Sequence, residues 1–153
     1  PGPQHQSPKA LKDELMEMNK RMLREDSLRI VNYIERHNYD MKLQEDGIWM
    51  EIYKKGNGPA IETDDLVRYN YRVELLDGTL CYTSDSTGAK TIRAGRSGQE
   101  AGFEYTLLKL RQGDHARFIL LPHHAHGLLG DRRRIPPYST IVYEVNILDI
   151  KKN

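Results

Sequence analysis

The chain has 153 residues, of which 38% are hydrophobic, so it suits one domain with a modest core plus an appendage and is too short for two domains of ordinary size. Lysine and arginine number 23 against 22 aspartate and glutamate, and this balance gives no reason to expect nucleic acid or an anionic membrane surface as a partner. The single cysteine, Cys81, excludes an internal disulfide and any zinc site built from several cysteines. No run approaches the roughly 20 apolar residues of a membrane-spanning helix.

Residues 1–45 are expected to form a flexible lead-in and a helical arm. Ser7 is a suitable N-cap with Pro8 at the first helical position, whereas residues 1–6 show no hydrophobic periodicity. Apolar residues then recur at spacings of three and four, as on one helix face: Leu11, Leu15, Met18 and Met22. Residues 25–27, Glu-Asp-Ser, predict a break and a new cap, so that a second helix carries Ile30, Val31 and Ile34 and ends near residue 38.

The apolar stripe of this arm has two interpretations. It packs against the body of the protein, or it docks a second copy or another partner. Each such side chain contributes roughly 1.5 to 3 kcal/mol on full burial, so we expect the stripe to be buried in one of these ways.

Residues 46–153 show the pattern of an antiparallel sheet. A run rich in β-formers at 48–53 ends in turn-forming residues 56–59. In residues 67–75 apolar and polar side chains alternate, which predicts a strand with one buried face. Asp77-Gly78 favours a hairpin turn, followed by a return strand at 79–82, a polar loop at 83–89 and a short strand at 90–94.

A single short helix is predicted between residues 101 and 110. Phe103, Leu107 and Leu110 recur at helical spacing, and Gly113 follows. Strands are expected at 115–120 and from residue 141 onward, and the long connection between them is bounded by Pro122 and by Pro136-Pro137. Unstructured loops longer than about 12 to 15 residues are uncommon in compact domains, so we expect this one to be functional. Antiparallel strands with one embedded helix predict an α+β domain.

The second part of the chain has a specific resemblance to a known family. The order and spacing of one set of residues resemble the C-terminal half of an FKBP-type peptidyl-prolyl isomerase: Gly102-Phe103-Glu104, Leu110, Gly113, Ala116, Leu120-Leu121-Pro122, Ala125, Gly127, Gly130, Ile135-Pro136-Pro137, Thr140, Val142-Tyr143 and Val145. Val67, Tyr69, Asp77-Gly78 and Tyr82 extend the similarity, which covers roughly residues 47–150. The resemblance implies an FKBP-like twisted antiparallel sheet wrapped around one short helix, as an isomerase domain at 46–153 behind an N-terminal helical extension.

The implied reaction needs no acid, base, metal or cofactor. Rotation about an Xaa-Pro bond takes tens to hundreds of seconds unaided, because resonance must be broken as the amide twists. A twisted amide is less polar than a planar one, so an apolar pocket that excludes water and binds the twisted form better accelerates the rotation. Aromatic walls are sufficient for this.

The resemblance also implies which residues form the pocket. Catalytic walls are expected from Tyr69, Tyr82, Phe103 and Tyr143, with Phe103 as the floor. Substrate contacts are expected from Thr83, Ile92, Gln99, Glu100, His126 and Ile135. We expect this pocket to be the only substantial concave site and to bind the macrolide inhibitors of the family.

Three of these positions depart from the family pattern. Glu100 replaces an aliphatic residue, Thr83 an acidic one and His126 a tyrosine. The backbone N–H at Glu100 and a donor on His126 remain available, while Asp85 could replace the missing acid only if the loop register shifts. Desolvating the Glu100 carboxylate when peptide binds costs free energy unless a partner such as an arginine of the 132–134 run pairs with it, and the three departures predict weak catalysis.

The leading hypothesis is therefore a peptidyl-prolyl cis-trans isomerase that assists protein folding. The alternative is a module that binds or chaperones proline-containing polypeptides with little or no turnover. A metal site at His123, His124 and His126 is disfavoured because no second ligand cluster exists, and the arginines at 132–134 are by default solvated, although at a pocket rim they would favour acidic substrates.

Residues 8–38 are the expected interface of a homodimer. The chain resembles bacterial envelope members of the family, some of them lipid-anchored, and a start at Pro1 fits removal of an upstream segment. The expected location is the cell envelope or periplasm, otherwise the cytoplasm.

Overall fold

The computed structural model describes residues 7–127 and 130–153. It divides into two compact units, residues up to Asn38 and residues Tyr39–Asn153, which are described separately below. The sequence pattern predicts this division at residue 45. Residues 39–45 lie in the second unit, where Lys42 and Leu43 form a short strand with Met50 and Trp49. No helix among the described residues has the length and apolar character that crossing a bilayer requires.

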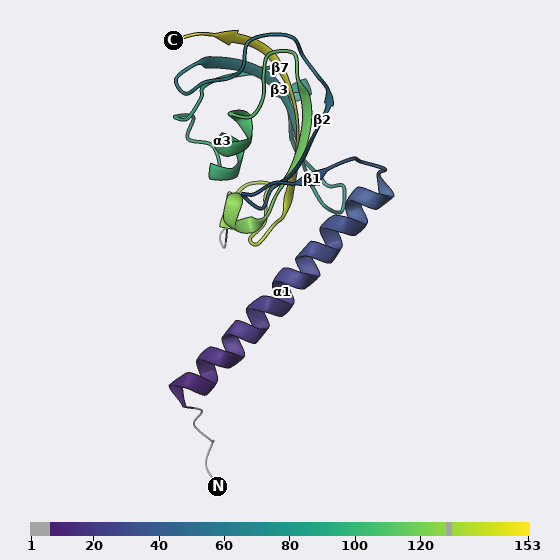
Figure 1. Ribbon diagram of the computed structural model, residues 1–153, viewed down its shortest axis with the longest axis vertical. Coiled ribbons are helices and arrows are strands. Elements are labelled where there is room, and N and C mark those ends of the chain that lie inside the picture. Colours follow the sequence, from purple (N-terminus) through teal and green to yellow (C-terminus); the bar gives the residue numbers. More distant parts are fainter. Residues whose placement is uncertain (1–6, 128–129) are drawn as a thin grey trace. The chain divides into compact units, whose positions relative to one another are not determined.

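The first unit is one continuous helix, α1, from Pro8 to Arg36 (Figure 1). Ser7 caps it, because its Oγ accepts a hydrogen bond from the Ala10 N–H at 3.1 Å. The helix ends where His37 is the C-cap and Asn38 adopts the left-handed conformation, with φ of 55°. The predicted break at residues 25–27 is wrong. Glu, Asp and Ser each weaken a helix by less than about 0.7 kcal/mol, whereas interruption usually takes proline or glycine.

The apolar stripe of α1 is exposed on the described helix. Leu11, Leu15 and Met18 keep 49%, 51% and 44% of their surface accessible. The side chain of Met22, the fourth member, lies outside the described residues.

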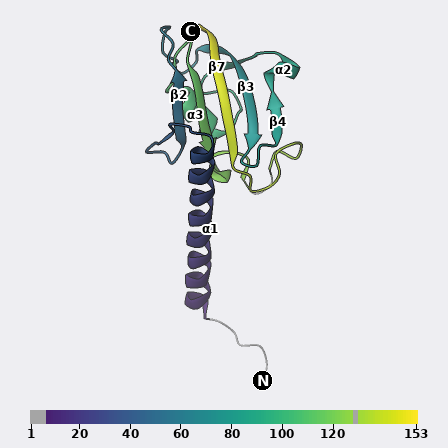
Figure 2. The same ribbon diagram turned by 90° about the vertical axis from the view of Figure 1, so that its right-hand side faces the viewer.

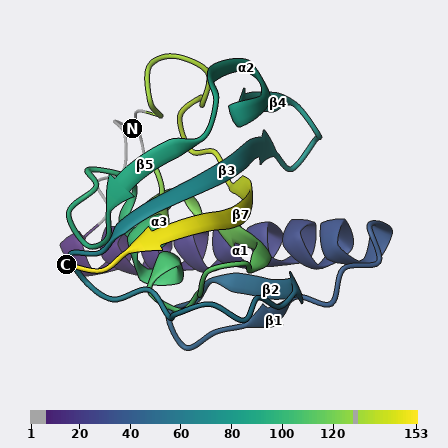
Figure 3. The same cartoon turned by 90° about the horizontal axis from the view of Figure 1, so that it is seen from above.

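The second unit is built on one antiparallel sheet in the order β1-β2-β6-β7-β3-β4, with β5 also paired to β3 (Figures 2 and 3). Its strands are β1 (Lys42–Leu43), β2 (Trp49–Lys54), β3 (Leu66–Leu75), β4 (Leu80–Thr83), β5 (Lys90–Arg93), β6 (His115–Leu120) and β7 (Ile141–Lys151). The expected strands are present, and β1 is an additional one. β3 and β7 lie at the centre and pair along most of their length. β4 and β5 pair with different ends of the same edge of β3, so between them Asn70 and Tyr71 pair with β7 alone.

Helix α3, Ala101–Leu107, lies against one face of this sheet (Figure 3). It ends earlier than predicted, with Leu108 as its C-cap. Leu110 lies in the turn that follows, where its N–H donates to Leu107 O. Two further helical turns were not predicted. α2, Ser84–Thr87, occupies the expected polar loop, and a 3-10 turn, Pro122–His124, begins the long β6–β7 connection.

The core lies between α3 and the sheet. Phe103 of α3 is fully buried, and its ring centre lies 5.4 Å from that of Tyr69 on β3 and 5.2 Å from that of Tyr143 on β7. Tyr143 in turn stacks on Phe118 of β6, with the ring planes at 10°. The alternating pattern of β3 therefore places Tyr69 inside, as predicted.

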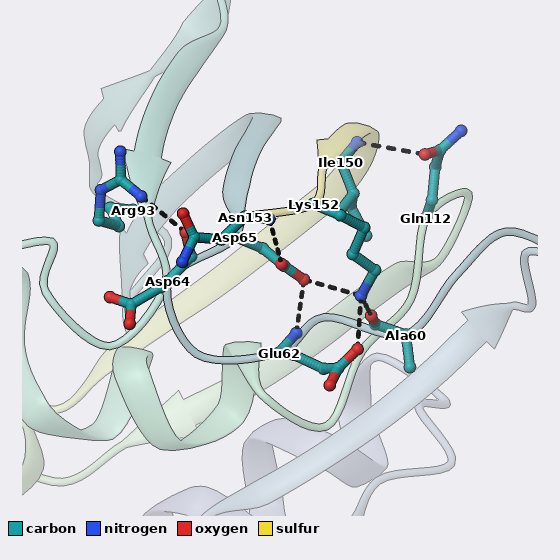
Figure 4. Close-up of polar contacts among 9 residues, drawn as sticks. All are labelled: Ala60, Glu62, Asp64, Asp65, Arg93, Gln112, Ile150, Lys152 and Asn153. Carbon is teal, nitrogen blue, oxygen red and sulfur yellow. Dashed lines mark hydrogen bonds and ion pairs between the residues drawn. The ribbon is translucent and has the colours of Figure 1, made fainter.

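A polar cluster fastens the end of β7 to the segment that precedes β3 (Figure 4). Lys152 Nζ donates to Asp65 Oδ2 at 2.8 Å, to Glu62 Oε1 at 2.9 Å and to Ala60 O at 2.6 Å. Asp65 is only 2% exposed and also accepts from the backbone N–H groups of Glu62 and Asn153. The buried carboxylate is thus fully hydrogen-bonded, as buried charges must be.

Candidate functional site

A cavity of about 320 Å³ opens between β3, β4, β7, the N-terminus of α3 and the β6–β7 connection. Aromatic side chains form much of its wall, and charged groups stand among them. The lining residues are Tyr69, Tyr71, Val73, Tyr82, Lys90, Gln99, Glu100, His126, Asp131, Arg133 and Tyr143.

The structure brings many of the predicted site residues to this wall. They are Tyr69, Tyr82, Gln99, Glu100, His126 and Tyr143. Phe103 does not line the cavity. It lies in the core in ring contact with Tyr69 and Tyr143, so it supports the wall from behind.

Three predicted contacts lie elsewhere. Ile92 and Ile135 are buried in the core, 8% and 3% exposed, and are absent from the cavity wall. Thr83 lines a separate hollow together with Asp85, and its Oγ1 accepts the Asp85 N–H at the start of α2. Asp85 is absent from the cavity wall, so it does not replace the missing acid there.

Glu100 occupies the inner part of the cavity. Its side chain is 5% exposed, and Oε1 lies 2.7 Å from His126 Nε2, which donates to it in the tautomer that carries the proton on that nitrogen. The Tyr143 hydroxyl donates to both carboxylate oxygens, at 2.9 and 2.8 Å. In the described residues no arginine of the 132–134 run pairs with this carboxylate. The carboxylate lies inside the cavity, where His126 and Tyr143 occupy its oxygens.

This carboxylate dominates the electrostatics of the aromatic wall. Burial, reinforced by Glu100, raises the pKa of the Tyr143 hydroxyl well above its ordinary value. The same two causes, in the same order, raise the pKa of Tyr69. Both hydroxyls are therefore neutral donors at neutral pH, and that of Tyr143 is already committed to Glu100.

Asp131 is a pocket residue that sequence reasoning missed. The Tyr82 hydroxyl donates to its Oδ2 through a short hydrogen bond, and its Oδ1 accepts from the backbone N–H groups of Arg133 and Ile135 at 2.9 and 2.8 Å. Desolvation opposes ionisation here, yet these three donors lower the pKa of Asp131 below its ordinary value. The sequence pattern of residues 128–134 does not predict this role.

Tyr71, Val73 and Lys90 were missed as well, whereas Arg133 belongs to the arginine run for which a pocket rim was the alternative interpretation. Tyr71 and Val73 share the apolar face of β3 with Tyr69, so the alternation of that strand could have indicated them. Lys90 has no comparable sequence signal, because its place depends on how β5 pairs with β3.

The cavity is not the only substantial hollow of the second unit, and that expectation was wrong. A larger and more open hollow of about 680 Å³ is lined by Asp40, Lys42, Gln44, Met50, Glu51, Ile52, Tyr53, Lys55 and Lys109. Tyr53 is the only aromatic residue in its lining. We assign the candidate site to the smaller cavity, because four tyrosines, Tyr69, Tyr71, Tyr82 and Tyr143, line it and aromatic walls are typical of a ligand pocket.

The arrangement suits binding rather than bond-making chemistry. Within the described residues there is no cluster of three or more metal-ligating side chains. What the cavity offers is aromatic surface, donors that Glu100 already occupies, and a backbone N–H at Glu100 that makes no hydrogen bond within the described part of the chain.

Comparison with known proteins agrees with this geometry. The sequence matches the family described as FKBP-type peptidyl-prolyl cis-trans isomerase over residues 58–148. The inactive peptidyl-prolyl cis-trans isomerase FKBP6 of Homo sapiens is 32% identical over 108 residues, which cover 67% of this chain and 32% of that protein. The isomerase FkpA of Escherichia coli K12 is 28% identical over 111 residues, covering 72% of this chain and 40% of that protein. The chain thus spans about a third to two fifths of these relatives.

Two solved structures share the fold. The crystal structure of FkpA from Escherichia coli superposes with a TM-score of 0.68 at 24% identity, over 95% of this chain and 74% of that chain. The crystal structure of AtFKBP13 gives 0.70 at 19% identity, over 73% and 99% of the two chains. The predicted α+β, FKBP-like fold is confirmed. With more than half of its length matching the family and its sheet wrapped on α3, the chain belongs to the FKBP-type peptidyl-prolyl cis-trans isomerases.

Proposed function

We propose that the protein is a peptidyl-prolyl cis-trans isomerase that acts on proline-containing polypeptides and has a divergent, weakened pocket. The observation that supports this most is the cavity walled by Tyr69, Tyr82 and Tyr143 above the buried ring of Phe103. Such a wall binds a prolyl ring and keeps water from the amide, so the twisted, less polar amide is favoured.

The chain's own groups supply the remaining contacts. The unbonded backbone N–H of Glu100 donates to a substrate carbonyl at the cavity mouth. His126 and Tyr143 would do the same, but Glu100 already accepts their hydrogen bonds. A substrate must displace that carboxylate or bind without two donors, and this is the reason to expect slow turnover.

A coupled assay with a Leu-Pro or Phe-Pro tetrapeptide tests the proposal. We expect acceleration above the uncatalysed rate, and loss of that acceleration in Tyr82→Leu, which removes a wall ring. Tyr105→Ala, which changes an exposed side chain on α3, is the matched control and keeps the parent rate. Macrolide inhibitors of the family are expected to bind weakly and to compete with the peptide.

The same experiment tests a second function, the binding of proline segments without catalysis, because the Glu100 side chain occupies space that a substrate needs. The protein would then bind or chaperone proline segments with little turnover, as suggested by similarity to a relative whose name calls it inactive. Peptide binding by calorimetry without any acceleration would establish this alternative over catalysis.

We also propose that α1 dimerises the protein through Leu11, Leu15 and Met18, which are exposed on the described helix. Light scattering should give twice the chain mass for the parent and the chain mass for Leu11→Lys/Leu15→Lys. Asp13→Lys, on the opposite side of the helix, is the control that stays dimeric. A parent protein that remains monomeric at every concentration would reject the dimer.

Envelope location, with or without a lipid anchor, is part of the same proposal. It is supported by similarity to bacterial members of the family. Fractionation of the source cells tests it, since recovery in the cytoplasmic fraction would reject it.

A further inference from the structure

Positive charge gathers at the rim of the cavity. Lys90 and Arg133 line it, and Arg132 and Arg134 flank Arg133 in the chain. All four side chains belong to exposed residues. Across residues 7–127 and 130–153 none of them makes an ion pair with a carboxylate. Lys90 Nζ lies over the face of the Tyr71 ring, 6.0 Å from its centre.

The segment that carries the arginines is fixed to the cavity wall. Asp131 binds the Tyr82 hydroxyl on one side and the N–H groups of Arg133 and Ile135 on the other. Its own N–H donates to Ile135 O at 3.0 Å. Arg132 sits between these anchors with φ of 61°, a conformation that costs free energy for a residue other than glycine. The three arginines are therefore held on a hydrogen-bonded turn, whereas Lys90 lies on β5.

The carboxylates near the cavity keep their negative charge, but in the described residues none of them forms an ion pair with these four cations. Glu100 is bound by His126 and Tyr143, and Asp131 by Tyr82 and two N–H groups. Glu104 accepts from the N–H and the hydroxyl of Ser97. Because the whole chain has a formal charge of only +1, the excess at the rim is local.

We propose that the site prefers proline segments with an anionic side chain next to the proline, namely aspartate, glutamate or a phosphorylated serine or threonine. This deepens the proposed function and rests on it. Guanidinium groups match the geometry of carboxylate and phosphate oxygens, and an ammonium group adds charge without directional demand. Rim charges act on encounter and on KM, while the aromatic wall binds the prolyl ring.

Glu100 alone would favour the opposite choice, a basic substrate. The Glu100 side chain, however, is 5% exposed and its carboxylate is hydrogen-bonded to His126 and Tyr143 inside the cavity, whereas the four cations are exposed and form no ion pair in the described residues. A side chain flanking the proline meets the rim before it meets Glu100. The anionic preference therefore prevails.

The test compares matched peptides that differ only in the residue preceding proline: Glu, phosphoserine, Leu and Lys. Turnover and binding are both measured with the full chain, at about 50 mM and about 500 mM salt. We expect kcat/KM for the Glu and phosphoserine peptides to exceed that for the Lys peptide by roughly threefold to tenfold at low salt. Screening should reduce the ratio at high salt. A larger gain for phosphoserine than for Glu identifies phosphate as the preferred anion.

Charge reversal provides the second arm. Lys90→Glu/Arg133→Glu should lose the preference or invert it, with Leu-peptide turnover changed less than Glu-peptide turnover. Lys151→Glu is the control. It changes one exposed cation on β7 eight residues beyond Tyr143, about 26 Å away at a strand rise of roughly 3.3 Å per residue, and it should keep the parent ratio.

Equal rates and affinities for all four peptides would overturn the anionic preference and leave the isomerase proposal standing. A Lys preference would overturn it in favour of Glu100 as the specificity group. If no peptide is turned over or bound, both proposals fail together. Binding of the anionic peptides without turnover supports the preference and moves the function to the binding module.

Discussion

At the scale of single residues, Glu100 is the side chain that most distinguishes this pocket. Its carboxylate lies within hydrogen-bonding distance of His126 and Tyr143 and is 5% exposed. Water or a charge in a pocket that works by desolvating an amide reduces the advantage of the twisted form. Glu100 is therefore the first position at which to restore activity.

We predict that removal of this carboxylate raises activity toward a Leu-Pro peptide. Glu100→Ile alone leaves the buried Tyr143 hydroxyl without an acceptor, which costs roughly 1 to 3 kcal/mol. The better variant is Glu100→Ile/Tyr143→Phe, which removes both partners. We expect kcat/KM to rise about tenfold if roughly 1.4 kcal/mol of transition-state stabilisation is recovered.

Tyr143→Phe alone is the control for that experiment, and it should change activity less, because Glu100 keeps His126. A folded double variant with unchanged or lower kcat/KM would mean that Glu100 contacts substrate.

His124 is the second informative residue. Its Nε2 lies 2.9 Å from Asp46 O, and its Nδ1 is buried without a partner in the described part of the chain. Burial, followed by the nearby charge of His123, holds the pKa of His124 below its ordinary value. The unfolded state therefore binds a proton at a pH where the folded state does not.

We predict that the free energy of unfolding falls as pH drops through the ordinary histidine pKa of about 6.5, since protonation then favours the unfolded chain. His124→Gln, which can still donate to Asp46 O, should flatten this dependence between about pH 7.5 and pH 5. His123→Gln should retain most of it, because burial of His124 remains. Denaturant titrations at several pH values measure both slopes, and identical slopes for parent and His124→Gln would refute the assignment.

At the scale of elements, the packing of α3 on the sheet fixes the cavity. The first turn of this helix carries Glu100 as its N-cap, and the helix approaches β6 and the 3-10 turn closely at Gly102. A methyl group built on Gly102 would lie 2.7 Å from Leu120 Cδ2, 2.8 Å from His124 Cβ and 2.9 Å from His124 O. Only a residue without a Cβ permits this approach.

We predict that Gly102→Ala destabilises the protein by roughly 1 to 3 kcal/mol, as overpacked core substitutions do. Alanine gains about 1 kcal/mol in helix propensity, but overlap with a backbone oxygen cannot be relieved by a rotamer change and outweighs that gain. Urea denaturation measures the difference, with Tyr105→Ala as a control expected within about 0.5 kcal/mol of the parent. An unchanged midpoint for Gly102→Ala would mean that α3 can shift away from the sheet.

At the scale of the second unit as a whole, the cluster around Asp65 joins the end of the last strand to the segment before β3. Lys152 is its only side-chain cation in the described residues, and it bonds Asp65 Oδ2 at 2.8 Å (Figure 4). Lys152, followed by the Glu62 N–H, lowers the pKa of Asp65 below its ordinary value. The stabilisation is thus present above the ordinary carboxyl pKa of about 4 and is lost as pH falls through the lower folded value.

We predict that Lys152→Met lowers the Tm at about pH 7, because a buried carboxylate loses its cation. The neighbouring Lys151→Met, on an exposed side chain, should have little effect. The difference between Lys152→Met and the parent should shrink as pH falls through the lowered pKa of Asp65 in the folded parent, because the carboxyl then becomes protonated in both proteins. A difference that persists unchanged in acid would assign the loss to packing of the lysine stem.

The sequence alone determined the family, the strand pattern and the aromatic wall of this protein. These are local properties, since alternation in β3 places Tyr69 inward and helical spacing places Phe103 on the buried face of α3. The helix at residues 8–36 was also evident, but its continuity through Glu25, Asp26 and Ser27 was not, because those residues weaken a helix without stopping it.

Only the tertiary structure decided which polar groups meet inside the cavity. Glu100 finds His126 and Tyr143, which lie 26 and 43 positions away, and Tyr82 finds Asp131 at a separation of 49. The tertiary structure also decided that Ile92 and Ile135 lie in the core and not at the cavity wall. Such contacts depend on how strands and loops converge in space, and no periodicity within one segment encodes them.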